Sequence, residues 1–187
     1  YAFSLQRITA AWLRVGQVLS DEKISELRAL DEQEVVYQRA LRLLEHRPRA
    51  EEEIRRKLGS KGISSAVIDK IIERLRQNKL VNDDQFAQAW VENRSTFRPR
   101  SRKALQYEMR QKGVSPSAIS QALANLETNE EELAYQAALK QSRKLNHLER
   151  MEFRRKLSGF LARRGFGYET IAPVVEKVWK EINKTEE

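Results

Sequence analysis

The sequence contains the same short turn three times, and this repetition constrains the fold more than any other feature. Each copy is a basic residue, a glycine and an apolar residue: Lys61-Gly62-Ile63, Lys112-Gly113-Val114 and Arg164-Gly165-Phe166. The glycines are 51 and then 52 residues apart. Apolar residues recur four and eight positions before each glycine and six and ten positions after it, which is the spacing of one helix face. The sequence therefore predicts a repeat protein.

The glycine in each copy has the character of a helix C-terminus. A residue just past the last helical turn often adopts positive φ, which glycine tolerates best, and a preceding cation suits the negative end of the helix dipole. In the second copy Ser115 precedes Pro116, a combination that favours the start of a new helix. Ser64 or Ser65 stands at that place in the first copy, and Gly167 in the third. Two helices are thus expected to meet at a tight turn in every copy.

The predicted fold class is all-α, with three tandem three-helix repeats in an elongated, curved molecule. A bundle of about 45 residues buries little apolar surface, so each repeat is expected to be stabilised by packing against its neighbour. We place the repeats at residues 33–80, 81–127 and 128–187, after an N-terminal extension over residues 1–32. From residue 50 onward the expected helices cover 50–61, 65–78, 83–96, 101–112, 116–126, 130–145, 149–164 and 168–184.

The N-terminal extension is expected to contain a strand and a helix. Apolar and polar residues alternate over residues 1–6, which indicates a short strand, and Ser20 can cap a helix that follows. Asp31 and Glu34 have the spacing of a capping box, which predicts that a separate helix begins there and opens the first repeat. Because the chain begins at Tyr1 and not at methionine, we expect native residues to precede it.

Several protein classes are disfavoured by composition. No apolar run approaches the roughly 20 residues of a membrane helix, and nothing resembles a signal peptide, so a cytoplasmic protein is expected. The absence of cysteine excludes disulfides and thiolate metal sites. No phosphate-binding glycine loop or nucleophile elbow is found. We therefore expect no catalytic residue, no metal ligand and no cofactor.

The remaining polar candidates have structural interpretations. His46 and His147 are the two histidines, and neither belongs to a zinc or catalytic pattern, so structural or surface roles are favoured. Asp83 and Asp84 resemble a metal-binding pair, but they stand where a helix must begin and lack further ligands nearby in sequence. Capping is therefore the preferred role for these two carboxylates.

The positive charge is concentrated in one part of the chain. Between Arg47 and Lys112 there are 17 basic residues and 9 acidic ones, which accounts for the whole formal charge of +8. A surface of this kind favours a polyanion, either nucleic acid or an acidic protein groove. The alternative is an ordinary solvated face on a charge-rich helical protein.

The candidate contact residues are the basic side chains near the repeated turns. Arginine clamps a carboxylate or phosphate with two hydrogen bonds, whereas lysine supplies a point charge. Helical spacings of three, four and seven place several of them on neighbouring faces. The candidate partner- or polyanion-binding residues are Arg55, Arg56, Arg98, Arg100, Arg102, Lys103, Arg110, Lys112, Arg154, Arg155, Arg163 and Arg164. Some are expected to pair instead with neighbours such as Glu52 and Glu152, at only about 0.2 to 0.5 kcal/mol each.

Several segments together are typical of one protein family. They are Glu45-His46-Arg47-Pro48-Arg49, Ile54-Arg55-Arg56-Lys57-Leu58, Asn82-Asp83-Asp84-Gln85-Phe86-Ala87, Asn93-Arg94, Arg98-Pro99-Arg100, Arg110-Gln111-Lys112-Gly113-Val114, Arg154-Arg155-Lys156-Leu157 and Arg164-Gly165-Phe166. Through them almost the whole chain resembles the RecX family of bacterial RecA modulators. Residues 1–6, with Gly16 and Leu19-Ser20, also resemble the N-terminal extension of some members.

The resemblance implies a function as well as a fold. Proteins of this family have three tandem three-helix repeats and lie in the helical groove of the RecA filament on DNA. They oppose ATP hydrolysis, strand exchange and coprotease function, and so act in DNA repair, homologous recombination and the SOS response. The resemblance implies that the partner of this chain is that filament. We also expect a non-catalytic monomer, with weak direct binding to single- or double-stranded DNA as a secondary property.

One residue departs from the family pattern. Phe97 precedes Arg98-Pro99-Arg100, where relatives often carry glycine before the basic helix of the second repeat. Because isolated aromatic side chains at helix ends usually pack, we expect the Phe97 ring to be buried. An exposed ring that stacks on a base or on a partner is the alternative.

Two other function classes remain open. A direct DNA-binding protein with helix-turn-helix-like repeats has the right order of elements, but the helices after the turns open with Ser65-Ala66-Val67-Ile68 and Pro116-Ser117-Ala118-Ile119. These side chains are poor readers of base edges, which leaves salt-sensitive phosphate binding. A helical scaffold that binds no polyanion is the third class, and reversing surface charges in it would have no effect.

Overall fold

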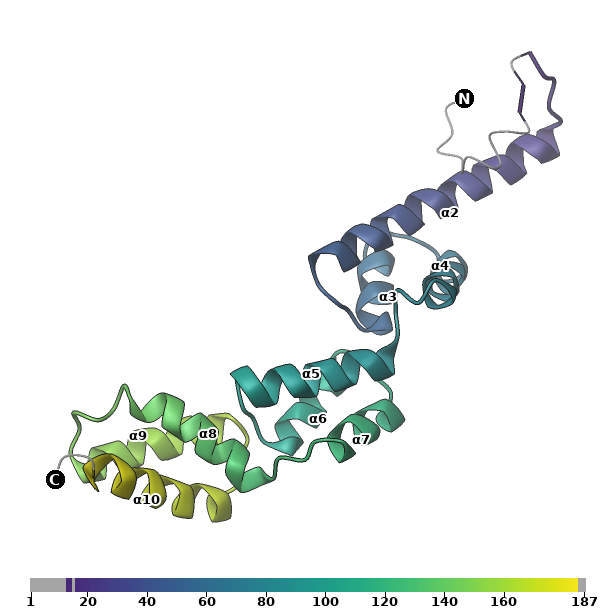
Figure 1. The fold of residues 1–187 in the computed structure, drawn as a ribbon. Coiled ribbons are helices and arrows are strands. Elements are labelled where there is room, and N and C mark those ends of the chain that lie inside the picture. Colours follow the sequence, from purple (N-terminus) through teal and green to yellow (C-terminus); the bar gives the residue numbers. More distant parts are fainter. Residues whose placement is uncertain (1–12, 15, 185–187) are drawn as a thin grey trace. The chain divides into compact units, whose positions relative to one another are not determined.

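The structure is a computed structural model that describes residues 13, 14 and 16–184. Within this part of the chain every regular element is a helix, which confirms the all-α prediction (Figure 1). The strand expected over residues 1–6 lies outside the described residues. Among the residues described, no helix combines the length and the apolar character needed to cross a membrane.

The helices form three consecutive groups of three, as the repeated turns predict. Repeat 1 contains α2 (Asp21–His46), α3 (Glu51–Gly59) and α4 (Ser65–Gln77). Repeat 2 contains α5 (Asp83–Phe97), α6 (Arg102–Gln111) and α7 (Pro116–Ala124). Repeat 3 contains α8 (Glu130–Ser142), α9 (Arg150–Arg163) and α10 (Tyr168–Lys184). Repeat 1 belongs to one compact unit, and repeats 2 and 3 together form the other.

The glycine turns have the predicted backbone conformation. The φ angles are +78° at Gly62, +81° at Gly113 and +92° at Gly165, all in the left-handed region that favours glycine. The Ser115 Oγ atom accepts a hydrogen bond from the Ala118 backbone N–H at 3.2 Å, which confirms this serine as a helix cap. Each turn therefore ends one helix and leads directly into the next.

Repeat 1 opens with a helix that is longer than predicted. Ser20 caps α2, because its Oγ atom accepts a hydrogen bond from the Lys23 N–H at 3.2 Å. The break predicted at Asp31 is wrong, since α2 continues to His46 without interruption. No proline or glycine lies between residues 21 and 46 to end the helix. The Glu34 carboxylate binds Arg74 of α4 at 2.7 Å, a tertiary contact that a capping pattern does not reveal.

The apolar stripes that flank the turns form the cores. In repeat 1 the stripe residues Ile54, Leu58, Ile68 and Ile72 are all buried in one cluster. In repeats 2 and 3 the buried stripe residues are Leu105, Met109, Ile119, Leu157, Leu161, Ile171 and Val175, and Phe86 and Phe153 are buried with them. Leu123 of the stripe is only partly buried, as are the aromatic residues Trp90, Phe160 and Trp179.

Repeats 2 and 3 contact one another at the start of α6. The Ser101 N–H donates a hydrogen bond to the Arg164 carbonyl oxygen at 3.1 Å, and the Arg164 guanidinium donates one to the Pro99 carbonyl oxygen at 2.9 Å. Gly165 lies directly against this corner. A Cβ atom on Gly165 would stand 2.5 Å from the Ser101 Oγ atom and 2.8 Å from the Ala104 Cβ atom. The absence of a side chain at residue 165 therefore permits the close approach of the two repeats.

Arg102 makes a second connection between these repeats. Its guanidinium donates hydrogen bonds to the carbonyl oxygens of Leu123 at 2.6 Å, Leu126 at 2.5 Å and Thr128 at 3.0 Å. Its backbone N–H donates to the Glu130 carboxylate at 3.0 Å. Carbonyl groups at the end of a helix lack intrahelical donors, so Arg102 caps the C-terminus of α7 and holds the linker to α8.

Candidate anion-binding surface

The two candidate residues of repeat 1 lie on α3 and are both engaged. The Arg55 guanidinium forms an ion pair with Asp69 of α4. The Arg56 Nε atom lies 3.9 Å from Glu52, one turn earlier on the same helix. Exposed ion pairs of this kind contribute little to stability. Arg56 is exposed on this repeat, whereas Arg55 is half-buried beside its ion-pair partner.

The structure brings three candidate residues of the other unit together at the junction of repeats 2 and 3. Arg98 and Arg100 flank the buried Pro99, and Arg164 reaches them from the end of α9. A fourth guanidinium, that of Arg94 on α5, completes the group. We call Arg94, Arg98, Arg100 and Arg164 the junction cluster.

Glu108 of α6 fixes two members of the junction cluster. The Nε atom of Arg94 lies 2.9 Å from Glu108 Oε2, and the Nε atom of Arg100 lies 3.0 Å from Glu108 Oε1. The Trp90 indole N–H also donates to Oε2, at 2.9 Å. This bond explains why Trp90 lies at the edge of the core instead of its centre, because a buried indole N–H needs an acceptor. The carboxylate thus aligns two guanidinium groups through their inner nitrogens.

Arg164 is held in place and partly buried. Its guanidinium carbon lies 4.6 Å from the centroid of the Phe160 ring, a cation–π distance. Burial lowers the pKa of Arg164, and the positive charges of Arg100, Arg98 and Arg94 lower it further. Arg164 is therefore close enough to each of the other three arginines to be repelled by its charge.

Arg94 was not predicted as a member of the site. The available signal was its position four residues before Arg98 and four after Trp90, which is one helical turn in each direction. In the structure its guanidinium carbon lies 4.4 Å from the Trp90 ring centroid. The Arg98 N–H also donates to the Arg94 carbonyl at 3.0 Å, so the helical turn carries both side chains to the junction.

Two candidate residues face inward instead of forming an open surface. The Arg102 guanidinium is occupied by backbone carbonyl oxygens, so Arg102 has a structural role in joining repeats 2 and 3. The Lys112 Nζ atom lies 4.3 Å from the Trp90 ring centroid and 6.0 Å from that of Phe86. Lys112 thus covers the aromatic edge of the repeat 2 core.

A second basic surface lies along α6. Lys103, Tyr107 and Arg110 are all exposed and are spaced by four and three residues, which places them on one helix face. The Tyr107 side chain is 64% exposed, which is unusual for a large aromatic group. The surface therefore combines two cations with an available aromatic ring.

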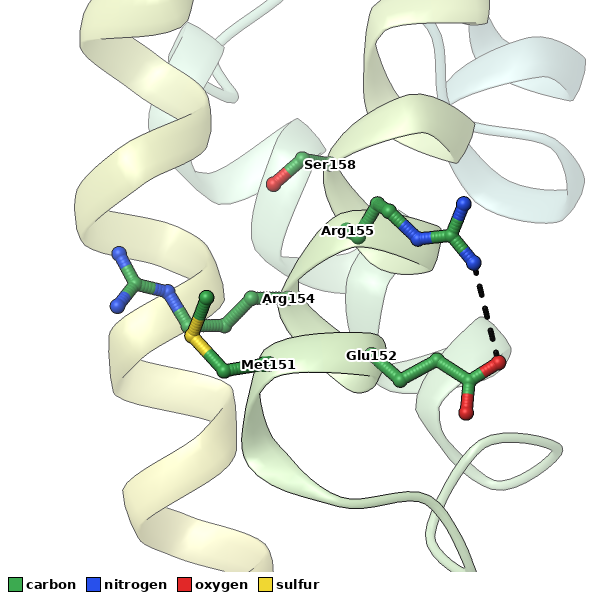
Figure 2. Close-up of a pocket in the computed structure, with 5 residues that line it drawn as sticks. All are labelled: Met151, Glu152, Arg154, Arg155 and Ser158. Carbon is green, nitrogen blue, oxygen red and sulfur yellow. Dashed lines mark ion pairs between the residues drawn. The ribbon is translucent and has the colours of Figure 1, made fainter.

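The remaining candidates lie on α9, around two surface hollows. The first hollow, of about 680 Å³, is lined by Met151, Glu152, Arg154, Arg155 and Ser158. Figure 2 shows Arg154 and Met151 extending to one side of α9 and the Arg155–Glu152 pair, 3.9 Å apart, to the other. Both arginines are exposed on this helix.

The second hollow lies next to the end of α8 and has a volume of about 390 Å³. Its basic lining residues are Arg155, Lys156 and Arg163. Gly159 forms part of the same lining, and a Cβ atom there would stand 3.4 Å from Arg163 Nη1. The Arg163 guanidinium therefore lies close over the helix backbone at Gly159.

The prediction that Phe97 is buried is wrong, because its side chain is 68% exposed. Phe97 is the last residue of α5, and the last buried residue of that helix is Val91. The ring thus lies beyond the core layers of repeat 2. Phe97 is thus an exposed apolar residue directly before Arg98 of the junction cluster in sequence.

Replacing Phe97 by alanine is accordingly expected to leave the free energy of unfolding unchanged to within about 0.5 kcal/mol, as at other exposed positions. Urea unfolding followed by far-ultraviolet circular dichroism measures this change. A loss of about 2 kcal/mol or more would mean that the ring packs against the protein in solution.

The acidic pair at the start of repeat 2 and the histidines do not assemble a metal site. Asp83 is the first residue of α5, and His46 is the last residue of α2. In residues 13, 14 and 16–184 there is no group of three or more His, Cys, Asp or Glu side chains that could hold a metal ion.

Comparisons with known proteins agree with this architecture. Three family models match the chain in order: the first RecX three-helix domain over residues 37–75, the second over 82–123 and the third over 129–175. The crystal structure of a regulatory protein RecX aligns with a TM-score of 0.71 at 24% identity, over 90% of this chain and 85% of the other. This structural likeness establishes the fold.

Sequence relatives carry the same name. The regulatory protein RecX of Geobacillus thermodenitrificans is 31% identical over 164 residues, which is 87% of this chain and 61% of that protein. The one from Streptomyces coelicolor is 35% identical over 142 residues, covering 75% of this chain and 76% of the relative. Because three consecutive domain models and relatives at this identity agree, the chain belongs to the RecX family.

Proposed function

We propose that the chain is a non-catalytic regulatory protein that binds in the groove of the RecA filament on DNA and inhibits the recombinase. The inhibited activities are ATP hydrolysis, strand exchange and coprotease function, through which the protein modulates DNA repair and recombination. Its membership in the RecX family supports RecA as the partner. In this proposal the protein acts as a cytoplasmic monomer and needs no cofactor.

The junction cluster is the observation that carries this proposal. It gathers four guanidinium groups where repeats 2 and 3 meet, and the contacts of Ser101 and Arg102 hold the two repeats together. Further exposed cations lie on α6 and α9 of the same unit. A repeated basic surface can meet successive subunits of a polymer through many weak contacts, so its affinity depends on an intact filament.

The proposal is tested by measuring DNA-dependent ATP hydrolysis by RecA in the presence of this protein. The wild-type protein is expected to inhibit hydrolysis, and the double variant Arg98→Glu/Arg100→Glu to require a concentration about tenfold higher or more, because reversed charges oppose association. Arg102 is left unchanged because its guanidinium caps α7.

The control is Lys144→Glu/Lys180→Glu, which makes the same change in net charge at two exposed lysines of repeat 3. It is expected to inhibit as strongly as the wild type. Equal inhibition by both double variants would reject the junction cluster as the contact surface. A folded wild-type protein that does not inhibit RecA would reject the proposed function itself.

Direct, sequence-independent DNA binding is a second candidate, favoured by the exposed face of α6. Lys103 and Arg110 suit phosphate groups, and the exposed Tyr107 ring between them suits stacking on a base. Titration of bare DNA across salt concentrations separates the two candidates, because binding to phosphates weakens steeply as salt rises. Tighter binding to bare DNA than to the RecA filament at matched salt would favour this second function.

A further inference from the structure

The junction cluster has more positive charge than its own surroundings neutralise. Among the described residues, Glu108 is the carboxylate that bonds to it, through Arg94 and Arg100. Two of the four guanidinium groups thus share this carboxylate, and no carboxylate of a described residue is bonded to the other two. Folding such a cluster has an electrostatic cost, which is visible in the pKa of Arg164, lowered by burial and then by the other three arginines. Like charges kept together against their repulsion are a common mark of a binding site.

The geometry leaves the hydrogen-bond donors of this cluster available. Glu108 contacts Arg94 and Arg100 through their Nε atoms, and their terminal nitrogens donate no hydrogen bond to a described residue. Arg164 uses Nη1 for the Pro99 carbonyl oxygen, and the exposed Arg98 side chain makes no hydrogen bond to a described residue. Two or more arginine forks fixed side by side are suited to oxyanions that accept bidentate hydrogen bonds.

We propose that the junction cluster is a receptor for a compact acidic segment of a protein partner, in which two or more carboxylates lie close together. This inference deepens the proposed function, because it states which chemistry on the filament the cluster recognises. The contacts of Glu108 show that two guanidinium groups of the junction cluster bind a carboxylate. A second, external carboxylate group would bind the remaining terminal nitrogens.

Two features favour a protein segment over a nucleic acid backbone. The four arginines converge at one corner of the unit, whereas a DNA backbone is followed by an extended row of cations. The exposed Phe97 ring, next to Arg98, offers an apolar contact that a side chain beside the carboxylates can cover. The cluster thus pairs a concentrated charge with a hydrophobic neighbour.

The receptor is tested with the full chain and a fluorescein-labelled hexaglutamate peptide, by fluorescence anisotropy at low salt. The double variant Arg98→Ala/Arg100→Ala is expected to bind the peptide about tenfold more weakly or worse, because charge-assisted hydrogen bonds are lost. The matched control Lys144→Ala/Lys180→Ala removes the same charge at two exposed lysines of repeat 3 and is expected to change the affinity by less than about twofold, because screened charges away from the receptor contribute little.

A third variant, Arg164→Lys, keeps the charge but loses the planar fork. It is expected to bind the peptide more weakly than the wild type, whereas attraction to a simple point charge would leave the affinity unchanged and overturn the receptor. Equal weakening by the two double variants would also overturn it, since general charge would then explain binding. Thermal unfolding of each variant confirms that its fold is kept.

A second titration replaces the peptide with an oligothymidylate of the same net charge, to compare carboxylate with phosphate binding. If Arg98→Ala/Arg100→Ala weakens oligothymidylate binding and leaves peptide binding intact, the cluster is a phosphate site and the inference is wrong. Failure of the RecA inhibition assay with intact peptide binding would reject the proposed function and leave the receptor standing. Loss of specific peptide binding with intact RecA inhibition would reject the receptor and leave the proposed function standing.

Discussion

Gly165→Ala is expected to lower the free energy of unfolding by about 3 kcal/mol or more. An alanine at φ of +92° is strained by about 1 to 2 kcal/mol. Its Cβ atom would also stand 2.5 Å from the Ser101 Oγ atom and 2.8 Å from the Ala104 Cβ atom, so repeats 2 and 3 must move apart. Urea unfolding measures the loss.

Gly62→Ala is the matched control for this prediction. Its φ angle of +78° imposes the same backbone strain, but no atom lies within 4 Å of the added Cβ position. A loss of only about 1 to 2 kcal/mol is therefore expected there. Equal losses at residues 62 and 165 would contradict the close approach of repeats 2 and 3 at Gly165.

Arg102→Met is expected to lower the free energy of unfolding by about 3 kcal/mol, because three backbone carbonyl oxygens lose their hydrogen bonds to a charged donor. Methionine keeps much of the side-chain length but donates no hydrogen bond. The carbonyl groups at the end of α7 then lose the cation that caps them. The change is measured by urea unfolding, with hydrogen exchange of α8 amides as a local readout.

Lys103→Met is the control for the Arg102 prediction. Lys103 is the next residue on α6, is exposed and carries the same charge. Its replacement is expected to change the free energy of unfolding by no more than about 0.5 kcal/mol. A comparable loss for both variants would show that the charge of α6, and not the carbonyl cap, stabilises the unit.

Much of the fold is encoded in local sequence patterns. The glycine turns and the apolar stripes around them predict the helices from α3 onward, whose ends fall within three residues of the predicted ones. The prediction failed at Asp31, because a capping pattern is compatible with a helix interior when a tertiary partner, Arg74, binds Glu34. It failed at Phe97 because helix-end packing depends on how far the core extends beyond Val91.

The site was less predictable than the fold. Helical spacing identifies which cations share a face of α6, but it does not reveal which face lies against the α7–α8 linker. Arg102 was therefore assigned to the contact surface, although its guanidinium is occupied by backbone carbonyl oxygens. Arg94 was missed because its place beside Arg164 arises from contacts between residues far apart in sequence.

Gly62 and Gly165 show that the same residue at equivalent positions of a repeat can meet different structural requirements. At Gly62 the chain requires only a torsion angle, which asparagine or aspartate also adopts in many proteins. At Gly165 it requires empty volume as well, which no other amino acid supplies. The first turn therefore tolerates more amino acid substitutions than the third. A substitution profile averaged over the repeats would underestimate this tolerance at Gly62 and overestimate it at Gly165.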